Sequence, residues 1–382
     1  MGEIDQAERI PLFKPLLEQE EHEAAQAALQ LGWLGMGSYV AGFERAIANL
    51  IEVAAPRVVA VSTGHSALHL ALLIADIRAG DEVMTPSFNN AADFQAILAA
   101  GGVPVFCDIR DDTLCIDIED AERRLTSRTK AIIATDYGHQ ICDHDALRQM
   151  AKRRNLRIIH DAAHSFGSRY KGQMVGNFSD FTVFSFDPIK NITCIDGGAI
   201  VPPDAESANS ARSMRFLGMT QSTDLLYQNK RARSYDIETI GFRYHMANLH
   251  AAIGMTQIAK MKVISESRQN ACHHYNRRLS RVAAVNIPAQ DLEHRVPFMY
   301  YVRVPADQRD DLRAFLDDRG IETGIHWKPG HQFTLLKQFH RGDLKITERV
   351  ANEIVSLPLH SKISLNQVDR VSDAIAAFFD AS

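Results

Sequence analysis

The fold is decided by a short apolar run that ends in polar residues, Arg157-Ile158-Ile159-His160-Asp161-Ala162-Ala163-His164. A short apolar run of this kind is typical of a buried strand. Six similar runs occur between residues 58 and 201, and helical patterns separate most of them. These runs lie at 58–61, 82–86, 103–106, 130–134, 181–186 and 198–201.

Continuous apolar strands separated by helices predict a mostly parallel sheet that is covered by helices on both faces. We therefore expect an α/β fold with a sheet of seven strands. After residue 248 the pattern changes, because a long helical stretch at 249–279 precedes mixed strand and helix patterns. This change predicts a large domain at 1–248, including the N-terminal segment, and a smaller α+β domain at 249–382.

The composition argues against several classes of protein. The chain has 382 residues, with 42 Lys+Arg against 47 Asp+Glu and a net charge of −5. Such a balance gives no general attraction to nucleic acid or to an anionic membrane. Its 5 cysteines include no C-x-x-C pair, which argues against a disulfide framework and fits a reducing compartment. The N-terminus does not resemble a signal peptide, so we expect a cytoplasmic protein.

In a parallel sheet of this kind, ligands bind outside the carboxyl ends of the strands. The first strand is followed by Ser62-Thr63-Gly64-His65-Ser66, which leads directly into a helical pattern. Glycine permits a close approach to the backbone, and the free N–H groups at a helix start favour phosphate. Plain helix capping remains the alternative interpretation of this turn.

The run at 157–159 is followed by an acid, Asp161, with a histidine on each side of it. The spacing of His160 and His164 superficially resembles a zinc motif, but that motif requires a helix. In a strand, two residues four apart are too widely spaced to chelate one ion in that way, so we expect no metal. Asp161 is then an acid at a strand end, available to pair with a cationic ring.

The strand at 181–186 leads to Asp187-Pro188-Ile189-Lys190-Asn191. A lysine near a desolvated crevice loses proton affinity and becomes an amine nucleophile for Schiff-base chemistry, although a solvated surface lysine is the alternative. A phosphate cradle, an acid and an amine at the strand ends of one sheet are together what pyridoxal phosphate (PLP) requires.

Motifs along nearly the whole chain occur in the same order as in one known family. They include Leu31-Gly32-Trp33-Leu34-Gly35-Met36-Gly37, Thr63-Gly64-His65-Ser66-Ala67-Leu68, Gly80-Asp81-Glu82-Val83, Asp161-Ala162-Ala163-His164, Phe184-Ser185-Phe186 with Lys190-Asn191, and Gly324-Ile325-His326-Trp327. The chain resembles the DegT/DnrJ-type sugar aminotransferases, which have the fold type I of PLP-dependent enzymes.

The resemblance implies a role for each matching position. Lys190 would bind the cofactor covalently and move the proton, and Asp161 would pair with the pyridine nitrogen. His164 would lie near the ring hydroxyl. The phosphate would be held by Gly64, His65 and Ser185. The stretch 241–246 resembles a segment that family members donate across a dimer interface, so the resemblance implies a homodimer with shared active sites.

Four positions depart from the family pattern. His65 replaces the usual Thr, and Arg243 replaces an Asn that usually reaches the neighbouring subunit's phosphate. Asn90 aligns with the aromatic residue that usually stacks on the cofactor ring; Phe88 and Phe94 lie nearby. His160 replaces the usual Glu before the acid.

The leading functional hypothesis is a transaminase that moves an amino group from L-glutamate to a 3-keto or 4-keto nucleotide-linked deoxysugar. The product would serve amino-sugar biosynthesis, such as that of lipopolysaccharide O-antigens. His326, Trp327, Lys328 and His331 are candidate substrate contacts, or a plain surface loop. One alternative is a PLP-dependent sugar dehydratase, which has His in place of the lysine, and another is a non-catalytic protein of the same fold. The sequence disfavours a dinucleotide-binding oxidoreductase, because no G-x-G-x-x-G follows the first strand.

Overall fold

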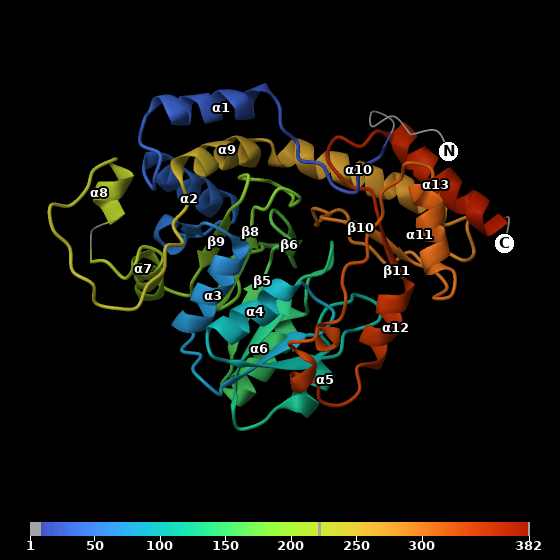
Figure 1. Cartoon of the computed structure of the whole chain (residues 1–382), viewed down its shortest axis with the longest axis horizontal. Coiled ribbons are helices and arrows are strands. Elements are labelled where there is room, and N and C mark those ends of the chain that lie inside the picture. The colour runs from blue at the N-terminus through green and yellow to red at the C-terminus, as the bar shows by residue number, and fades with distance from the viewer. Residues whose placement is uncertain (1–8, 221–222, 381–382) are drawn as a thin grey trace.

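Seven strands form one sheet in the centre of the computed structural model, which describes residues 9–220 and 223–380 (Figure 1). Their order across the sheet is β1-β9-β8-β5-β4-β2-β3. The strands are β1 (Val59–Val61), β2 (Glu82–Pro86), β3 (Val103–Cys107), β4 (Thr129–Thr135), β5 (Arg157–Asp161), β8 (Phe181–Ser185) and β9 (Gly198–Val201). Strand β9 is antiparallel to β1 and β8, and the other neighbouring pairs are parallel. The predicted seven-stranded, mostly parallel sheet is therefore confirmed.

Helices cover both faces of this sheet, as the apolar character of its strands requires. In β4, Ala131 and Ile133 pack into one hydrophobic cluster, while Ile132 and Ala134 pack into another on the opposite face. Successive strand residues point to opposite faces, so both sides must be dry. The covering helices are α2 (Ser38–Leu50), α3 (Gly64–Ile74), α4 (Ala91–Ala99), α5 (Ile118–Arg124), α6 (His144–Arg154), α7 (Ala205–Met214) and α9 (Asn248–Ala259).

The predicted long helix after residue 248 consists of two helices, α9 and α10 (Met261–Leu279). Lys260 separates them, with φ −90° and ψ 2°. Its ammonium group forms ion pairs with three glutamates at the start of α1 (Gln19–Gln30). Helix α1 packs along α9 above the sheet (Figure 1).

The C-terminal part contains a small antiparallel sheet of β10 (Tyr300–Arg303) and β11 (Ile354–Leu357), beside α10, α11 (Arg309–Asp317) and α13 (Leu365–Asp380). These elements share a hydrophobic cluster with Ile10 from the N-terminal segment. Ile10 also forms a parallel bridge with Ile321. The division of the chain at residue 248 stays a prediction. Elements that the sequence did not predict include α1 and α2, the hairpin of β6 (Arg169–Tyr170) and β7 (Gln173–Met174), α8 (Thr223–Tyr227), α12 (Lys345–Glu353) and β11.

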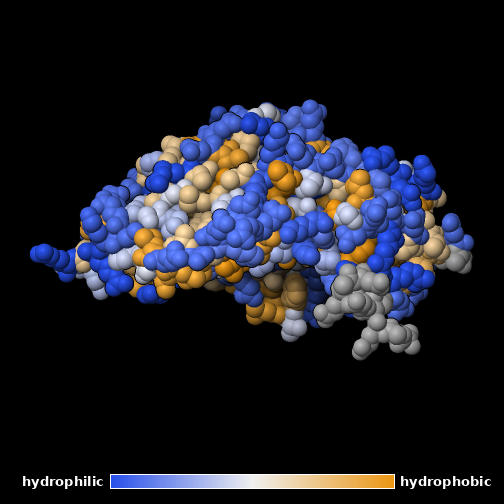
Figure 2. All heavy atoms as spheres, turned by 90° about the horizontal axis from the view of Figure 1, so that it is seen from above, coloured by the Kyte–Doolittle hydropathy of each residue, from blue (hydrophilic) through white to orange (hydrophobic). Residues whose placement is uncertain are grey.

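The molecular surface over α1 and α9 is mostly hydrophilic, with hydrophobic residues scattered among polar ones (Figure 2). Within residues 9–220 and 223–380, every helix is too short or too polar to cross a membrane.

Candidate active site

The helix start after β1 lies directly against the end of β8. An added Cβ on Gly64 would lie 2.7 Å from Cβ and 3.0 Å from Oγ of Ser185, so only glycine permits this approach. Thr63 caps α3 by accepting a hydrogen bond from the Ser66 N–H group (2.9 Å). The N–H groups of Gly64 and His65 precede the first intrahelical bond and are suited to an anion. Capping and an anion cradle therefore coexist in this turn.

Asp161 is buried at the carboxyl end of β5. Its Oδ1 accepts a hydrogen bond from the Ala163 N–H group (3.0 Å). Burial raises the pKa of Asp161, while Lys190 favours its charged form. A cation that displaces water beside this carboxylate would be strongly favoured, since the local dielectric constant is low.

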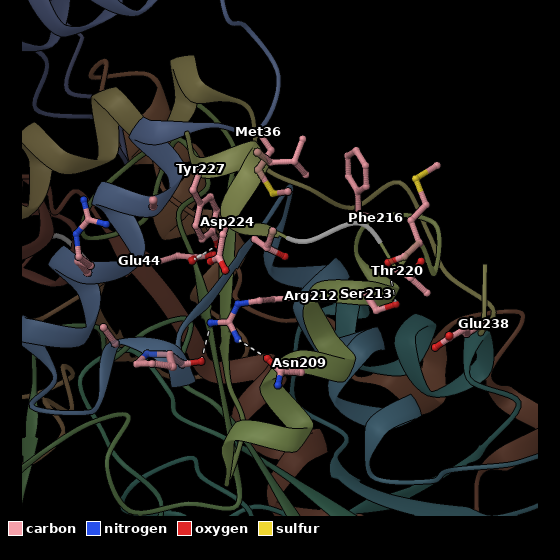
Figure 3. A pocket seen from close by; sticks show the side chains of 17 residues that line it. Met36, Glu44, Asn209, Arg212, Ser213, Phe216, Thr220, Asp224, Tyr227 and Glu238 are labelled. Atoms are coloured by element: carbon pink, nitrogen blue, oxygen red, sulfur yellow. Dashed lines mark hydrogen bonds between the residues drawn. The ribbon is translucent and has the colours of Figure 1, made fainter. Parts of the chain in front are cut away.

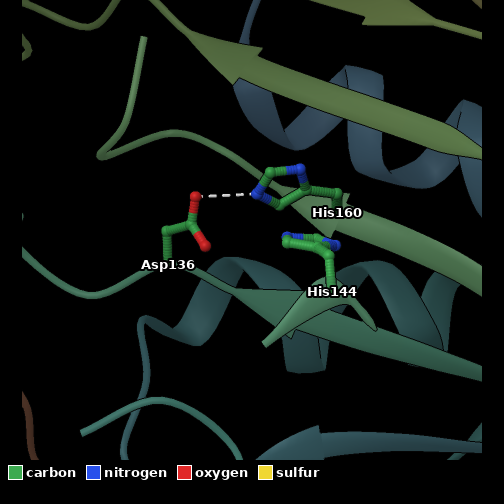
Figure 4. Close-up of side chains that lie close together, drawn as sticks. All are labelled: Asp136, His144 and His160. Atoms are coloured by element: carbon green, nitrogen blue, oxygen red, sulfur yellow. Dashed lines mark hydrogen bonds and ion pairs between the residues drawn. The ribbon is translucent and has the colours of Figure 1, made fainter. Parts of the chain in front are cut away.

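His160, one residue earlier on β5, takes part in a separate buried cluster with Asp136 and His144 (Figure 4). His160 Nε2 and Asp136 Oδ2 are 2.7 Å apart, and Ser165 Oγ donates to the same oxygen (2.5 Å). This cluster contains the donor atoms that could hold a metal ion, but both oxygens of Asp136 already accept protein hydrogen bonds, Oδ1 from the Cys142 N–H group (2.9 Å). It does not include His164, so the zinc pairing of the two histidines is not formed.

Lys190 lies over the ring of Phe298, with Nζ 4.4 Å from the ring centroid. Burial lowers the pKa of Lys190 to about 8, against the opposing charges of Asp161, Asp187 and Asp93. A fraction of these amines is therefore uncharged near neutral pH, as a nucleophile requires. The alternative of a solvated surface lysine does not fit this environment.

His164 stacks on Phe298 as well, with ring centroids 4.3 Å apart and an angle of 22° between the rings. Its Nδ1 accepts a hydrogen bond from the Gly138 N–H group (3.3 Å). Burial and the charge of Lys190 lower the pKa of His164 well below its usual value. The ring is thus neutral, with its proton on Nε2. Phe298 was not among the candidate site residues, yet its ring contacts both Lys190 and His164; the sequence marks it only as an aromatic residue in the mixed pattern after residue 279.

The two unusual residues near the cofactor position meet at the start of α4. Asn90 Oδ1 caps this helix by accepting from the Ala92 N–H group (2.9 Å). His65 Nδ1 donates to the Ala92 carbonyl (3.2 Å). Phe88 and Phe94 pack deep in the core, against Tyr137 and Phe106 respectively.

Of the four candidate substrate contacts in the loop before α12, two lie near His164 and Lys190 and two contact other residues. Trp327 is nearly parallel to His164, with ring centroids 6.3 Å apart. Burial, followed by the charge of Lys190, lowers the pKa of His326 to about 4. Lys328 Nζ instead lies 5.2 Å from the Phe333 ring centroid. His331 is buried against Ser87, with Nδ1 2.8 Å from Ser87 Oγ.

Arg243 is exposed, and its backbone pairs with that of Phe216. The flanking rings of Phe242 and Tyr244 both pack against His69 on α3. The segment 241–246 therefore runs past the end of β1, where the Tyr244 carbonyl accepts from the Ser62 N–H group (2.7 Å). Among residues 9–220 and 223–380, no hydrogen bond or ion pair engages the exposed guanidinium of Arg243.

Residues 15–376 match the description of one protein family. The chain belongs to the DegT/DnrJ/EryC1/StrS aminotransferase family. Similar solved structures include the aminotransferase TlmJ from Streptoalloteichus hindustanus, with 30% identity, a TM-score of 0.91, and 97% of this chain and 99% of TlmJ covered. Helicobacter pylori PseC, an aminotransferase of pseudoaminic acid biosynthesis, has 25% identity and a TM-score of 0.90, covering 98% and 100% of the two chains. The PLP form of Spr1654 from Streptococcus pneumoniae has 25% identity and a TM-score of 0.90, covering 98% and 99%.

The family and the site residues together indicate pyridoxal phosphate as the cofactor of this sugar aminotransferase fold. The fit rests on the chain's own geometry. Gly64 and Ser185 leave a space that a Cβ would fill, beside the free N–H groups of a helix start. Asp161 offers a buried carboxylate and Lys190 a partly neutral amine.

A cavity of about 740 Å³ lies elsewhere in this aminotransferase, between α2, α7 and α8 (Figure 3). Its lining includes Glu44, Arg212, Tyr227 and Glu238. Neither Lys190 nor Asp161 lines it. Since the chemical groups described above lie at the carboxyl ends of β5 and β8, we place the active site there and not in this cavity.

Proposed function

We propose that this protein transfers the amino group of L-glutamate to the keto carbon, at C-3 or C-4, of a nucleotide-linked deoxysugar. The single observation that carries the proposal is the position of Lys190. Its half-buried, partly neutral amine lies near the buried carboxylate of Asp161, and a neutral histidine stacks on the same aromatic ring that the amine contacts. The presence of Lys190 favours transamination over dehydration, because the dehydratases of the same fold have His in place of this lysine.

The chain's residues divide the work of such a reaction. Pyridoxal phosphate, when bound, supplies an electron sink for the carbanion formed at the substrate carbon. The carboxylate of Asp161 stabilises a protonated ring nitrogen, and Gly64 with Ser185 anchors the phosphate. Lys190 Nζ takes the proton from the donor's carbon and later returns one to the sugar carbon. Phe298, whose ring lies 4.4 Å from the amine, limits the access of water to it.

A homodimer with shared sites is part of the proposal. The segment before Arg243 exposes Tyr235, Ile237 and Ile240, which are 57%, 58% and 79% accessible. Exposed apolar side chains gathered on one segment favour burial against a partner. In such a dimer the free guanidinium of Arg243 would reach the phosphate of the neighbouring subunit.

The test is a turnover screen with L-glutamate against nucleotide-linked 3-keto and 4-keto sugars. We expect an amino sugar product with at least one of them, and loss of turnover in Lys190→Ala and Asp161→Asn. Absence of amination across the whole panel, with the cofactor bound, would contradict the proposed substrate class. Substantial turnover by Lys190→Ala would show that another group moves the proton.

A further inference from the structure

A second buried acid lies beside Asp161, and the proposed reaction does not use it. Asp93 lies on α4, in an otherwise mostly apolar helix, and is fully buried. The register of β4 and β5 places Thr135 beside Asp161, and Asn89 follows the end of β2. These four polar residues, from three strand ends and a helix, therefore meet at one buried point.

The hydrogen bonds of Asp93 are unequally shared between its two oxygens. Oδ2 accepts from Asn89 Nδ2 (2.5 Å) and from Thr135 Oγ1 (2.7 Å). Oδ1 is buried and accepts no hydrogen bond from any side chain or backbone group in the described part of the chain. A buried charged oxygen without a donor is strongly unfavourable, whereas a protonated oxygen needs only an acceptor.

Asp161 is the acceptor within reach. Thr135 Oγ1 donates to Asp93 and is the strand neighbour of Asp161, so the two carboxyl groups lie at the same buried point, where two ionised carboxylates would repel each other. Lys190 and His160 favour the charged form of Asp161, and Lys190 acts more weakly on Asp93. Burial, followed by repulsion from Asp161, raises the pKa of Asp93 well above its usual range. The proton of the pair therefore belongs on Asp93.

We propose that Asp93 is a neutral carboxylic acid whose Oδ1–H group donates to Asp161 and holds that carboxylate ionised and oriented toward the cofactor's ring nitrogen. Asp93 is a positioning residue, since it acts through Asp161. The orientation toward the cofactor rests on the proposed function, whereas the pairing of the two acids does not.

The pairing is tested on the cofactor-free protein by infrared difference spectroscopy of wild type against Asp93→Asn at pH 7. We expect the wild type to show the C=O stretching band of a neutral carboxyl group, shifted in D₂O, that the variant lacks. Asp120→Asn is the matched control, because buried Asp120 pairs with Arg124 (2.5 Å) and its loss should remove a carboxylate band instead. A carboxylate difference band for Asp93→Asn would overturn the proposal.

The consequence for Asp161 is tested by titrating the cofactor-free protein with pyridoxamine 5′-phosphate. Asp93→Asn should bind within about twofold of wild type, because an amide Nδ2 donates as the acid does. Asp93→Leu, which has no donor, should bind about tenfold more weakly. Equal affinities of the Leu and Asn variants would overturn the inference, whether both bind like the wild type or both bind more weakly. Failure of the wild type to bind would overturn the proposed function instead, and the infrared result would stand.

Discussion

Lys190 Nζ lies 4.4 Å from the centroid of the Phe298 ring, and the ring of His164 stacks on the same Phe298. Phe298 precedes β10, whereas Lys190 and His164 follow strands of the large sheet. A residue near the start of β10 thus covers part of an amine that follows the large sheet. A residue that keeps water from the amine also sets the pH range in which the amine is reactive.

Replacing Phe298 by Ala should shift the reactivity of Lys190 to higher pH. Water that enters the space would favour the ammonium form, so the pKa of the amine should rise from about 8 toward its usual value. The measurement is the rate at which cofactor-free protein captures pyridoxal phosphate between pH 6 and about 10. Phe298→Leu keeps the site apolar and serves as the control. An unchanged pH profile in Phe298→Ala would rule out this role of Phe298.

The fold should be more stable without the amine of Lys190. Its folded-state pKa of about 8 lies below the usual 10.5, so the unfolded chain binds the proton more tightly and Lys190 destabilises the fold at low pH. Lys190→Met should therefore raise the free energy of unfolding of the cofactor-free protein by up to about 3 kcal/mol below pH 8. The gain should shrink as the pH rises from about 8 to 10.5. Denaturant unfolding at several pH values measures it, and a gain independent of pH would refute the electrostatic explanation.

The approach of Gly64 to Ser185 predicts the effect of a single methyl group. Gly64→Ala would place Cβ 2.7 Å from the Ser185 Cβ, so the helix start must move away from the phosphate position. We expect the dissociation constant for pyridoxamine 5′-phosphate to rise by about tenfold or more, as loss of charge-assisted hydrogen bonds implies. Gly35→Ala is the matched control, because no atom lies within 4 Å of its added Cβ. Equal affinities of the two variants would count against the cradle.

Shared active sites predict recovery of activity in mixed dimers. Lys190→Ala and Arg243→Ala subunits should each be inactive alone, yet a mixed dimer would contain one intact site. Random exchange of subunits should then restore about one quarter of the wild-type activity, since half of the dimers are mixed and each has one working site. Activity after unfolding and refolding the mixture together is the readout. No recovery, with dimers present, would place Arg243 outside the neighbouring site.

The sheet could be predicted from the sequence because each of its strands is a continuous apolar run with polar ends. The bounds of the seven strands differ from the predicted ones by at most two residues. The β6–β7 hairpin escaped prediction, since its strands have only two residues each around Gly172, whose φ is +84°. The break at Lys260 escaped because it depends on glutamates far away in sequence.

In the site, too, features set by local sequence could be predicted and features set by tertiary packing could not. Asp161 and Lys190 could be named as candidates because each lies at or soon after the end of an identifiable strand, Asp161 as the last residue of β5 and Lys190 shortly after β8. Phe298 and Asp93 could not, because they reach the site only through tertiary packing. Asp93 left one signal, an acid within an otherwise mostly apolar helix. The expected substrate contacts also separated, since Trp327 lies beside His164 whereas His331 is buried against Ser87.

The most direct test of the proposed active site is to identify the residue that binds the cofactor covalently. Protein loaded with pyridoxal phosphate would be reduced with borohydride, digested and mapped by peptide mass spectrometry. We predict that the added cofactor mass lies on Lys190 and is absent after prior conversion with L-glutamate. Labelling of another lysine, such as Lys328, or a label that persists unchanged after glutamate, would contradict it.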